Sequence, residues 1–439
     1  MSARWPQLEP APVAERVPVT EVLHGVTITD PYRWLEESNN PRTREWGRSQ
    51  TERTRRALGA VPWRQQLREE LWAAYATGSV AAPYVAGDWL YFERRAPSDN
   101  QPTLRRLSLA AEARSDPEQV IVDPNHLDDR GLVSLDWWMP SSDGKLVAYG
   151  LSSNGDEWST LYITDATTGK RLDDTIPRTR GASVAWEMDA SGFFYTRYPL
   201  AGTMPESELS YHQRVFYHRL GSPSEQDPLI YGDDWPRETV FDVSLSQSGR
   251  YLLLTAMQGW SRSDLLLADR GTAPQPTSLT HTTAGLADEQ LSGELTFARL
   301  TADIDALWYG RMVEQPGTGE QLFVRTDWHA PCGRILSVDL EAAAVTPPER
   351  WHQVVQEPAE GVYEFFVVTD RGLAIHFLHH ASSVIRMVDL SGRHLGDVQL
   401  PLYSGVSEIT GTALRRDFFR PISSFGRQPA ILRPEIEAP

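Results

Sequence analysis

The sequence predicts a mainly β protein: a seven-bladed β-propeller preceded by a short N-terminal helical segment. Two observations carry this prediction. Helical spacing of apolar residues is confined to the first part of the 439-residue chain, and from about residue 80 short apolar runs separated by turn residues recur at similar intervals. We therefore divide the chain into an N-terminal extended and helical segment, 1–79, and a propeller, 80–439.

The N-terminal segment contains two expected helices. In SNNPRTREWGRSQTERTRRALGA, Asn40 suits the N-cap and Pro41 the first helical position, where its missing N–H costs nothing. In VPWRQQLREELWAAYATG, Pro62 suits the first turn and Gly78 the C-terminal stop. One side of this second helix is apolar and needs a surface to lie against; it carries Leu67, Leu71, Trp72 and Tyr75.

The propeller prediction rests on a repeated unit. A tight turn followed by an apolar strand recurs at four glycines whose positions differ by 57, 48 and 57 residues: Gly87, Gly144, Gly192 and Gly249. Weaker copies occur around Asp303 and Gly372, and a faint terminal unit spans ITGTALRRDFFRPISSF. A strand ending in Asp often follows, as in LYITDATTGKRL and IRMVDLSGRHLGD. Such intervals, with about four strands in each, are typical of propeller blades, and the units add up to seven.

The charge balance excludes some classes of partner. The chain has 42 Lys and Arg against 59 Asp and Glu, a formal net charge of −17. Such a surface repels phosphate backbones and disfavours adsorption to anionic membranes. No apolar run approaches the length needed to cross a bilayer. We therefore expect no nucleic-acid partner and no membrane association.

Cysteine use and the N-terminus bear on the compartment. Cys332 is the only cysteine, which excludes an intrachain disulfide and a cysteine-rich metal site and favours a reducing compartment. The N-terminus MSARWPQLEPAPVAERVP lacks the basic region and apolar run of a secretory signal. We expect a cytoplasmic protein. In its APCG loop, Cys332 is expected to serve a turn rather than to act as a reactive thiol.

The stretch GLSSNG raises the question of a serine nucleophile. Acyl transfer by serine requires a hydroxyl on a sharp turn, a histidine base, an orienting carboxylate and amide donors. GLSSNG lies between two apolar strands, and its residue types are those of a hairpin connection. No G-x-S-x-G occurs in the sequence. We expect Ser152 and Ser153 to be turn residues and assign no catalytic residue.

Several histidines are candidate metal ligands. On a strand, His376 and His380 of IHFLHH share one face while His379 points to the other, so three converging ligands are not expected. His212 and His218 lie in the strand-like run YHQRVFYHRLG. We therefore predict no metal site and no cofactor.

Acidic pairs and tryptophans are expected to serve the fold. The pairs Asp173–Asp174 and Asp233–Asp234 are expected in solvated turns. The chain has 15 tryptophans, and most should pack between blades. A minority face the central channel or a rim, where their rings could contact a peptide. The tryptophans considered are Trp137, Trp138, Trp158, Trp186 and Trp235.

Several segments together resemble a known family. HGVTITDPYRWLEESNNPRTREW, from His24 to Trp46, resembles the opening of the prolyl oligopeptidase family, whose members begin with a DPYRWLE-type segment. Further similar segments follow in family order, among them DGKLVAYGLSSNGDEWSTLYITDATTGK, AWEMDASGFFYTRYP, APCGRILSVDL and DRGLAIHFLHHASSVIRMVDLSGRHL. The similarity covers nearly the whole chain. It implies that His212 and His218 are scaffold residues.

The resemblance implies a three-part order in the complete family: a helical segment, a seven-bladed propeller, and an α/β-hydrolase domain with the catalytic Ser, Asp and His. This chain ends at PISSFGRQPAILRPEIEAP, which resembles the last blade, so we expect the hydrolase domain to be absent. The expected protein is the N-terminal and propeller portion of a truncated or split serine endopeptidase. Its propeller would gate the access of short peptides, and the chain alone would not hydrolyse them.

Two other functional hypotheses stay open. Propellers commonly present a rim to protein partners, so a free-standing interaction module is the main alternative. Retention of the N-terminal segment, which in the family packs largely against the hydrolase domain, favours a truncated enzyme or one completed by a separately encoded hydrolase domain. An active peptidase with an unfamiliar arrangement of catalytic residues is disfavoured, because no residues in the sequence provide the geometry that a serine nucleophile requires.

Overall fold

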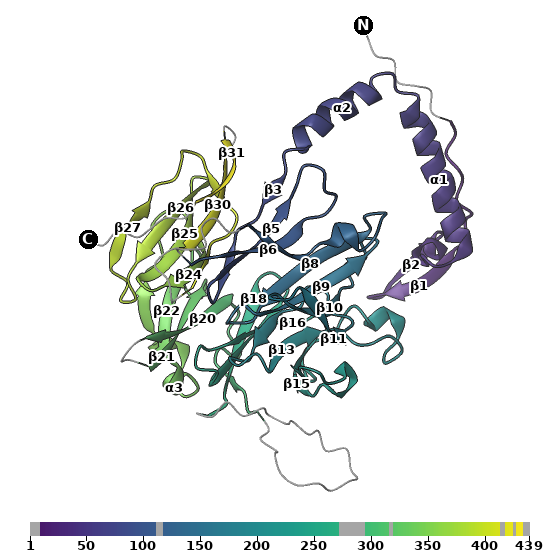
Figure 1. Ribbon diagram of the computed structural model, residues 1–439. Helices are drawn as coiled ribbons and strands as arrows, with labels where there is room; N and C mark the ends of the chain where they lie inside the picture. The colour runs from purple at the N-terminus through teal and green to yellow at the C-terminus, as the bar shows by residue number, and fades with distance from the viewer. Residues whose placement is uncertain are drawn as a thin grey trace. The chain divides into compact units, whose positions relative to one another are not determined.

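The computed structural model describes residues 9–110, 117–271, 295–315, 319–412, 418–424 and 427–432. The chain divides into two compact units, Met1–Thr77 and Gly78–Pro439, and each is described by itself (Figure 1). Parts of the predicted terminal blade, residues 413–417, 425–426 and 433–439, lie outside the described ranges.

The N-terminal unit holds a hairpin and two helices. Strands β1 (Val19–Leu23) and β2 (Val26–Asp30) are antiparallel, and η1 (Arg33–Glu36), α1 (Pro41–Gly59) and α2 (Arg64–Tyr75) follow. The Asn40 side chain accepts a hydrogen bond from the N–H of Arg42, which confirms the predicted cap. Pro62 precedes α2, because a turn from Val61 to Arg64 comes first. Within the described ranges, no helix combines the length and apolar character needed to cross a bilayer.

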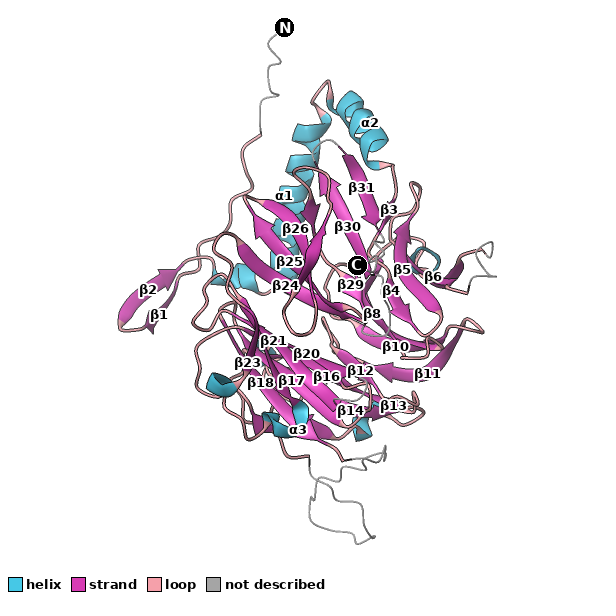
Figure 2. Ribbon diagram, turned by 90° about the vertical axis from the view of Figure 1, so that its left-hand side faces the viewer, coloured by secondary structure: helices cyan, strands magenta, loops and turns pink. Residues whose placement is uncertain are grey.

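The second unit consists of seven antiparallel sheets, the blades of a propeller (Figure 2). Blade 1 contains β3 (Ser79–Val80), β4 (Tyr84–Ala86), β5 (Trp89–Arg95), β6 (Thr103–Ser108) and β7 (Gln119–Val122), and blade 2 contains β8 (Val133–Pro140), β9 (Leu146–Ser153), β10 (Thr160–Asp165) and β11 (Lys170–Ile176). Blade 3 contains β12 (Val184–Trp186), β13 (Gly192–Arg197), β14 (Arg214–Arg219) and β15 (Leu229–Tyr231). Blade 4 contains β16 (Val240–Leu245), β17 (Tyr251–Gln258), β18 (Arg262–Asp269) and β19 (Ala298–Arg299).

Blades 5 and 6 repeat the four-strand pattern, whereas in blade 7 the first two short strands both pair with the third strand. Blade 5 contains β20 (Trp308–Gln315), β21 (Gly319–Thr326), β22 (Arg334–Asp339) and β23 (His352–Val355), and blade 6 contains β24 (Val362–Thr369), β25 (Gly372–His379), β26 (Ser382–Val388) and β27 (His394–Val398). Blade 7 contains β28 (Gly405–Val406), β29 (Thr410–Gly411), β30 (Phe418–Ser424) and β31 (Arg427–Leu432). Short helices interrupt the connections at η3 (Pro124–His126), η4 (Glu206–Glu208), η5 (Ser224–Gln226), α3 (Leu340–Ala343) and η6 (Pro348–Arg350). The predicted seven-bladed propeller is confirmed.

The predicted turns at Gly87, Gly144, Gly192, Gly249 and Gly372 join the first and second strands of a blade, but the copy around Asp303 lies in the connection between β19 and β20. Gly144 has a φ of +67°, and a Cβ there would lie 2.5 Å from the carbonyl oxygen of Ala86 in the neighbouring blade. Only glycine fits this close approach without a shift of the backbone. In blade 3 the left-handed residue is instead Ala190, which precedes Gly192. The spacing of these turns follows from the need to bring each blade against the next.

The hydrophobic core lies between neighbouring blades. Trp308 of blade 5, for example, is fully buried in a cluster that contains leucines of blade 4. Clusters of this kind also contain four of the tryptophans predicted to pack between blades, Trp137, Trp138, Trp186 and Trp235. Each blade therefore depends on its neighbours for the burial of its apolar faces.

The last blade contacts the first, which closes the ring. The hydroxyl of Thr410 on β29 donates to the carbonyl oxygen of Pro83 at 2.5 Å. The carboxylate of Glu408 accepts a hydrogen bond from the N–H of Ala82. Both acceptor–donor pairs join the segment before β30 to the segment before β4, so blades 1 and 7 are neighbours like the others.

Antiparallel strands place successive turns at alternate ends of the propeller. We call one end the connector rim: it holds the connections between blades and the turns between second and third strands. The opposite rim holds the turns between first and second strands. Ser79 pairs with Arg95 at the connector end of β5, so the chain enters the propeller at the connector rim.

Candidate functional site

Among the residues that the structure describes, most of the exposed large apolar side chains on the two rims of the propeller lie on the connector rim. Trp260, in the turn between β17 and β18, is 97% exposed. Leu402 is 85% exposed, and its neighbour Tyr403 is also exposed, in the connection between β27 and β28. Leu127, in the connection between β7 and β8, is exposed as well. Exposure of large apolar groups to water is energetically unfavourable, so these side chains mark the connector rim as a candidate contact surface.

A hollow opens on the connector rim at blade 3. It has a volume of about 260 Å³ and lies beneath the long connection between β13 and β14. Apolar and cationic side chains share its walls: Leu200, Met204 and Phe216 with Arg197, His212 and Arg214. The Arg197 guanidinium lies 4.2 Å from the Phe216 ring centroid, and Arg214 pairs with Asp233 at 2.7 Å. The hollow therefore offers an apolar surface edged by partly neutralised positive charge.

An aromatic–arginine stack stands beside this hollow. The Arg178 guanidinium lies 3.6 Å above the Trp158 ring, and the Tyr198 ring meets Trp158 edge-on at 5.3 Å. Burial lowers the pKa of Arg178 and raises that of Tyr198. Unlike the tryptophans of the blade interfaces, Trp158 therefore lies on a rim, where its ring packs against charge.

Side chains of the innermost strands face the axis of the propeller. Tyr84 on β4 is 40% exposed, yet surrounding protein raises the pKa of its hydroxyl, and the charge of Arg311 on β20 opposes that rise. Glu408 is also exposed, and burial raises its pKa as well. Because Tyr84 and Arg311 come from blades 1 and 5, this electrostatic influence joins two blades that are not adjacent in the ring.

Ser152, of the stretch GLSSNG, does not face a histidine. It is buried near the end of β9, and its hydroxyl donates to Asp136 Oδ1 at 2.9 Å. The Ser159 hydroxyl donates to Oδ2 of the same carboxylate at 2.5 Å. Asn154 and Gly155 form the turn, with φ values of +59° and +70°. The prediction that Ser152 and Ser153 are turn residues is therefore wrong: β9 continues to Ser153, the turn begins at Asn154, and Ser152 holds Asp136 from within the strand.

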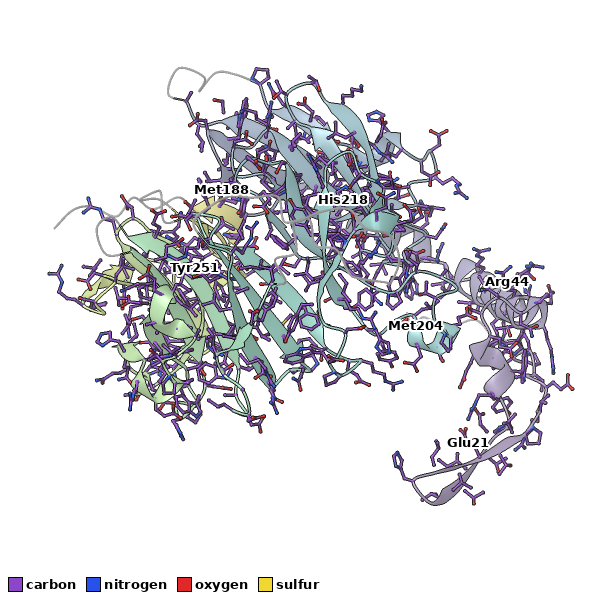
Figure 3. All side chains as sticks on the ribbon, turned by 90° about the horizontal axis from the view of Figure 1, so that it is seen from below. Glu21, Arg44, Met188, Met204, His218 and Tyr251 are labelled. Atoms are coloured by element: carbon purple, nitrogen blue, oxygen red, sulfur yellow. The ribbon has the colours of Figure 1, made fainter. Side chains whose placement is uncertain are left out.

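His218, labelled in Figure 3, is buried, and it lies between two aspartates of neighbouring blades. Its Nδ1 lies 2.9 Å from Asp227 Oδ1, and its Nε2 lies 3.1 Å from Asp174 Oδ1. The Tyr195 hydroxyl donates to Asp227 Oδ2 at 2.8 Å. Burial opposes the protonation of His218, but the hydrogen bonds and charges of Asp227 and Asp174 outweigh it and raise the pKa of the imidazole. This network joins blade 2 to blade 3.

Two expectations about this region are wrong. Asp174 was expected in a solvated turn, but it lies within β11 and is buried, because β11 continues beyond the turn and its side chain meets His218 across the blade interface. His212 was expected in a strand, but it precedes β14 with a φ of +60°. The pair Asp233–Asp234 is exposed as predicted, and Asp233 binds Arg214.

The histidines of IHFLHH also differ from expectation. His376 is buried, and its Nε2 lies 2.8 Å from the Ser383 hydroxyl. Strand β25 ends at His379, and His380 and Ala381 form a turn with φ values of +49° and +56°. The alternation of side chains therefore stops at His379, and the rings of His379 and His380 lie together, 4.0 Å apart between centroids.

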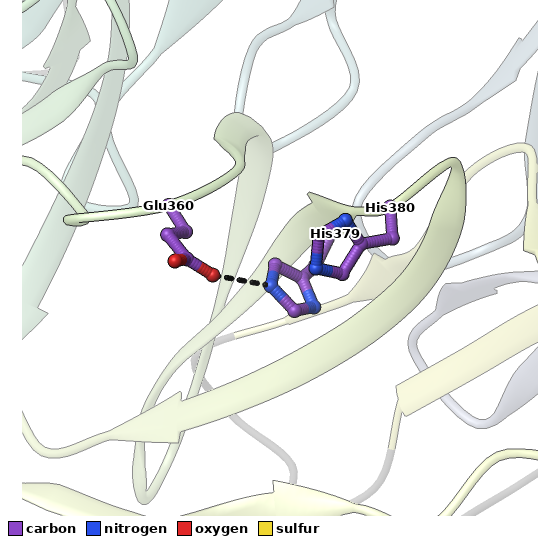
Figure 4. Close-up of side chains that lie close together, drawn as sticks. All are labelled: Glu360, His379 and His380. Carbon is purple, nitrogen blue, oxygen red and sulfur yellow. Dashed lines mark hydrogen bonds and ion pairs between the residues drawn. The ribbon is translucent and has the colours of Figure 1, made fainter.

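In the ranges that the structure describes, Glu360, His379 and His380 form a group that could hold a metal ion, with ligand atoms within 4.8 Å of one another (Figure 4). His379 Nε2 lies 3.3 Å from Glu360 Oε2. No pattern in the sequence points to Glu360, because its place beside the two histidines comes from the approach of two separate loops.

Cys332 lies in the turn between β21 and β22, where its N–H donates to Glu357 Oε1 at 2.7 Å.

Comparison with known proteins identifies relatives over nearly the whole chain. Residues 12–432 match the family described as "Prolyl oligopeptidase, N-terminal beta-propeller domain". The prolyl endopeptidase of Elizabethkingia meningoseptica is 26% identical over 430 residues, which cover 96% of this chain and 55% of that protein. Prolyl oligopeptidase A of Galerina marginata is 29% identical over 341 residues, 72% of this chain and 43% of that protein. The chain thus spans about half the length of these relatives.

Solved structures agree with this similarity. A structure from a study of two prolyl endopeptidases and their inter-domain dynamics matches with a TM-score of 0.85 and 25% identity, over 97% of this chain and 58% of that one. Prolyl oligopeptidase B of Galerina marginata, bound to a 25-residue macrocyclization substrate, matches with a TM-score of 0.80 and 20% identity, over 98% of this chain and 59% of that one. At this identity the second match supports the fold alone.

Proposed function

Since the chain belongs to the prolyl oligopeptidase family through its N-terminal β-propeller domain, we propose that it is the propeller portion of a serine endopeptidase. In this proposal the connector rim docks an α/β-hydrolase domain that carries the catalytic residues. The propeller then restricts which peptides reach them. The observation that carries the proposal is the gathering of exposed apolar side chains on the connector rim, the end at which the chain enters the propeller.

Two surfaces support docking of a catalytic domain. Trp260, Leu402 and Tyr403 stand out from the connector rim, whereas the opposite rim exposes fewer large apolar groups, such as Met188 and Val345. In the N-terminal unit, the apolar side of α2 is exposed at Leu71 and Trp72. Burial of such side chains contributes about 1.5–3 kcal/mol each. A hydrolase domain, proposed because this chain spans about half the length of its relatives, is the occupant that we assign to both surfaces.

The axis of the propeller supports the gating part of the proposal. The charge of Arg311 on blade 5 influences Tyr84 on blade 1, and Glu408 stands near the junction of blades 7 and 1. The T-shaped contact of Tyr84 with Trp138, at 6.4 Å, holds the tyrosine ring in place. We propose that these side chains narrow a passage along the axis, so that it admits only thin, extended peptides. Passage of a folded protein would require the blades to separate.

We expect the chain alone to show no peptidase activity. Ser152 is buried and bound to Asp136, so its hydroxyl lacks the histidine base that activates a serine nucleophile. Incubation with a fluorophosphonate probe should leave the chain unlabelled by mass spectrometry, and a proline-containing chromogenic peptide should not be cleaved. A complete prolyl endopeptidase provides the positive control. A covalent adduct on Ser152 or Ser153 would contradict the proposal.

In the complex with its hydrolase domain, replacing both Tyr84 and Arg311 by alanine is expected to widen the passage. The kcat/KM for peptides of about 20 residues or more should rise severalfold relative to that for a short chromogenic peptide, because only the long substrates are limited by entry. Competition between the two substrates in one reaction measures the ratio. Arg393→Ala, an exposed position on the opposite rim, is the control and should leave the ratio unchanged. An unchanged ratio in the double variant would argue against gating along the axis.

A further inference from the structure

Glu360, His379 and His380 come from two loops of the connector rim. Glu360 lies in the connection between β23 and β24, and the histidines lie at the turn between β25 and β26. The left-handed φ of His380 and Ala381 makes this turn tight, so the two imidazoles project from consecutive residues without alternating. In Figure 4 the His379 ring lies between the Glu360 carboxylate and the His380 ring. Two imidazoles and one carboxylate are a ligand set used by zinc.

We propose that Glu360, His379 and His380 bind one Zn²⁺ ion. Metal–ligand bonds of about 2.0–2.2 Å in a tetrahedral site place donor atoms roughly 3.4 Å apart. The Glu360–His379 pair already meets this distance at 3.3 Å, and the widest separation in the group is 4.8 Å. Because Glu360 and His380 are exposed, rotation of their side chains can close the remaining gap without disturbing the core.

The surroundings favour an ion with one open coordination position. A hollow of about 440 Å³ adjoins the group and is lined by Glu360, His379, Phe377, Arg386 and Asp397, among others. The Arg386 guanidinium is engaged by Asp397 at 3.1 Å, so it does not leave an unpaired positive charge beside the metal. The Phe377 ring stacks on His379 and limits the rotation of its imidazole. A water molecule in the hollow would supply the fourth ligand.

Imidazole nitrogens suit Zn²⁺ better than they suit hard cations, so the ligand set predicts metal selectivity. Mg²⁺ and Ca²⁺, which prefer oxygen ligands, should not replace Zn²⁺ here.

Calorimetric titration of the metal-free full chain with ZnCl₂ tests the proposal. One equivalent should bind, and His379→Ala, His380→Ala and Glu360→Gln should each weaken binding about tenfold or more, as expected for loss of a ligand. His329→Ala, an exposed histidine on the same rim, should bind as the unchanged chain does. Circular dichroism of each variant verifies that the propeller is folded.

X-ray absorption of the zinc-loaded chain gives a second readout, independent of the variants. The site should show two imidazole nitrogens at about 2.0–2.1 Å and additional oxygen ligands. Equal affinity in the His379→Ala variant and the unchanged chain, or a loss of binding as large in His329→Ala, would overturn the proposal. So would a zinc spectrum with one imidazole or none.

Discussion

Replacing His218 by leucine is expected to lower the free energy of unfolding of the propeller by about 3–5 kcal/mol, as is typical when one member of a buried ionic group is removed. The substitution leaves the carboxylates of Asp174 and Asp227 facing the vacated position, and both are nearly inaccessible to water. Each retains one other donor, the Gly221 N–H for Asp174 and the Tyr195 hydroxyl for Asp227. Urea unfolding followed by tryptophan fluorescence measures the loss as a shift in midpoint at constant slope.

His212→Leu is the matched control, because His212 also faces a carboxylate in blade 3. Its Nε2 lies 3.2 Å from Glu208 Oε2, but both side chains reach solvent. An accessible pair of this kind contributes about 0–1 kcal/mol, so the midpoint should move little. If His218→Leu and His212→Leu unfolded at the same urea concentration, the network around His218 would not be a major source of stability between blades 2 and 3.

The sign of the pH dependence follows from the raised pKa of His218. A group whose pKa is higher in the folded chain than in the unfolded chain stabilises most fully below its unfolded pKa, here about 6.5. That contribution is lost as the pH rises through the folded pKa. The difference in stability between the unchanged chain and His218→Leu should therefore be larger at pH 6 than at pH 9. Unfolding curves at the two pH values measure it.

The sequence predicts the architecture well because the architecture depends on local patterns. Turn glycines such as Gly144 and short apolar strands recur in several blades, because those blades need a tight turn in the same place. The Asn40 cap was also predictable, since a capping side chain bonds to its own helix. These features need no knowledge of which distant residues meet.

The residues of the candidate site were less predictable, because they are defined by contacts between distant segments. Asp174 and His218 are 44 residues apart and meet only once blades 2 and 3 pack. Arg311 influences the pKa of Tyr84 although the two residues belong to blades 5 and 1. The arrangement of His379 and His380 depends instead on where β25 ends, because neighbouring side chains alternate within a strand but can lie together in the turn that follows it.

A charge placed on the connector rim is expected to weaken docking of the hydrolase domain. Leu402→Asp should raise the Kd for that domain about 30-fold or more, since burial of an unpaired carboxylate at an apolar contact costs about 2 kcal/mol or more. Trp260→Ala should have an effect of similar size, because tryptophans at the centre of interfaces often contribute 2 kcal/mol or more. Titration of the chain into the hydrolase domain, with turnover of a chromogenic peptide as the signal, gives the apparent Kd.

Val345→Asp provides a closely matched control for this experiment. Val345 is 84% exposed on the opposite rim, against 85% for Leu402, so both substitutions place a new carboxylate at an equally exposed apolar position of the same propeller. Any general effect of added negative charge on a chain with a net charge of −17 is therefore common to both variants. The two variants are expected to differ in their Kd for the hydrolase domain only if that domain docks on the connector rim. Equal affinities of the Leu402→Asp and Val345→Asp variants would place the docking surface elsewhere, whereas a selective loss in Leu402→Asp assigns it to the rim where the chain enters the propeller.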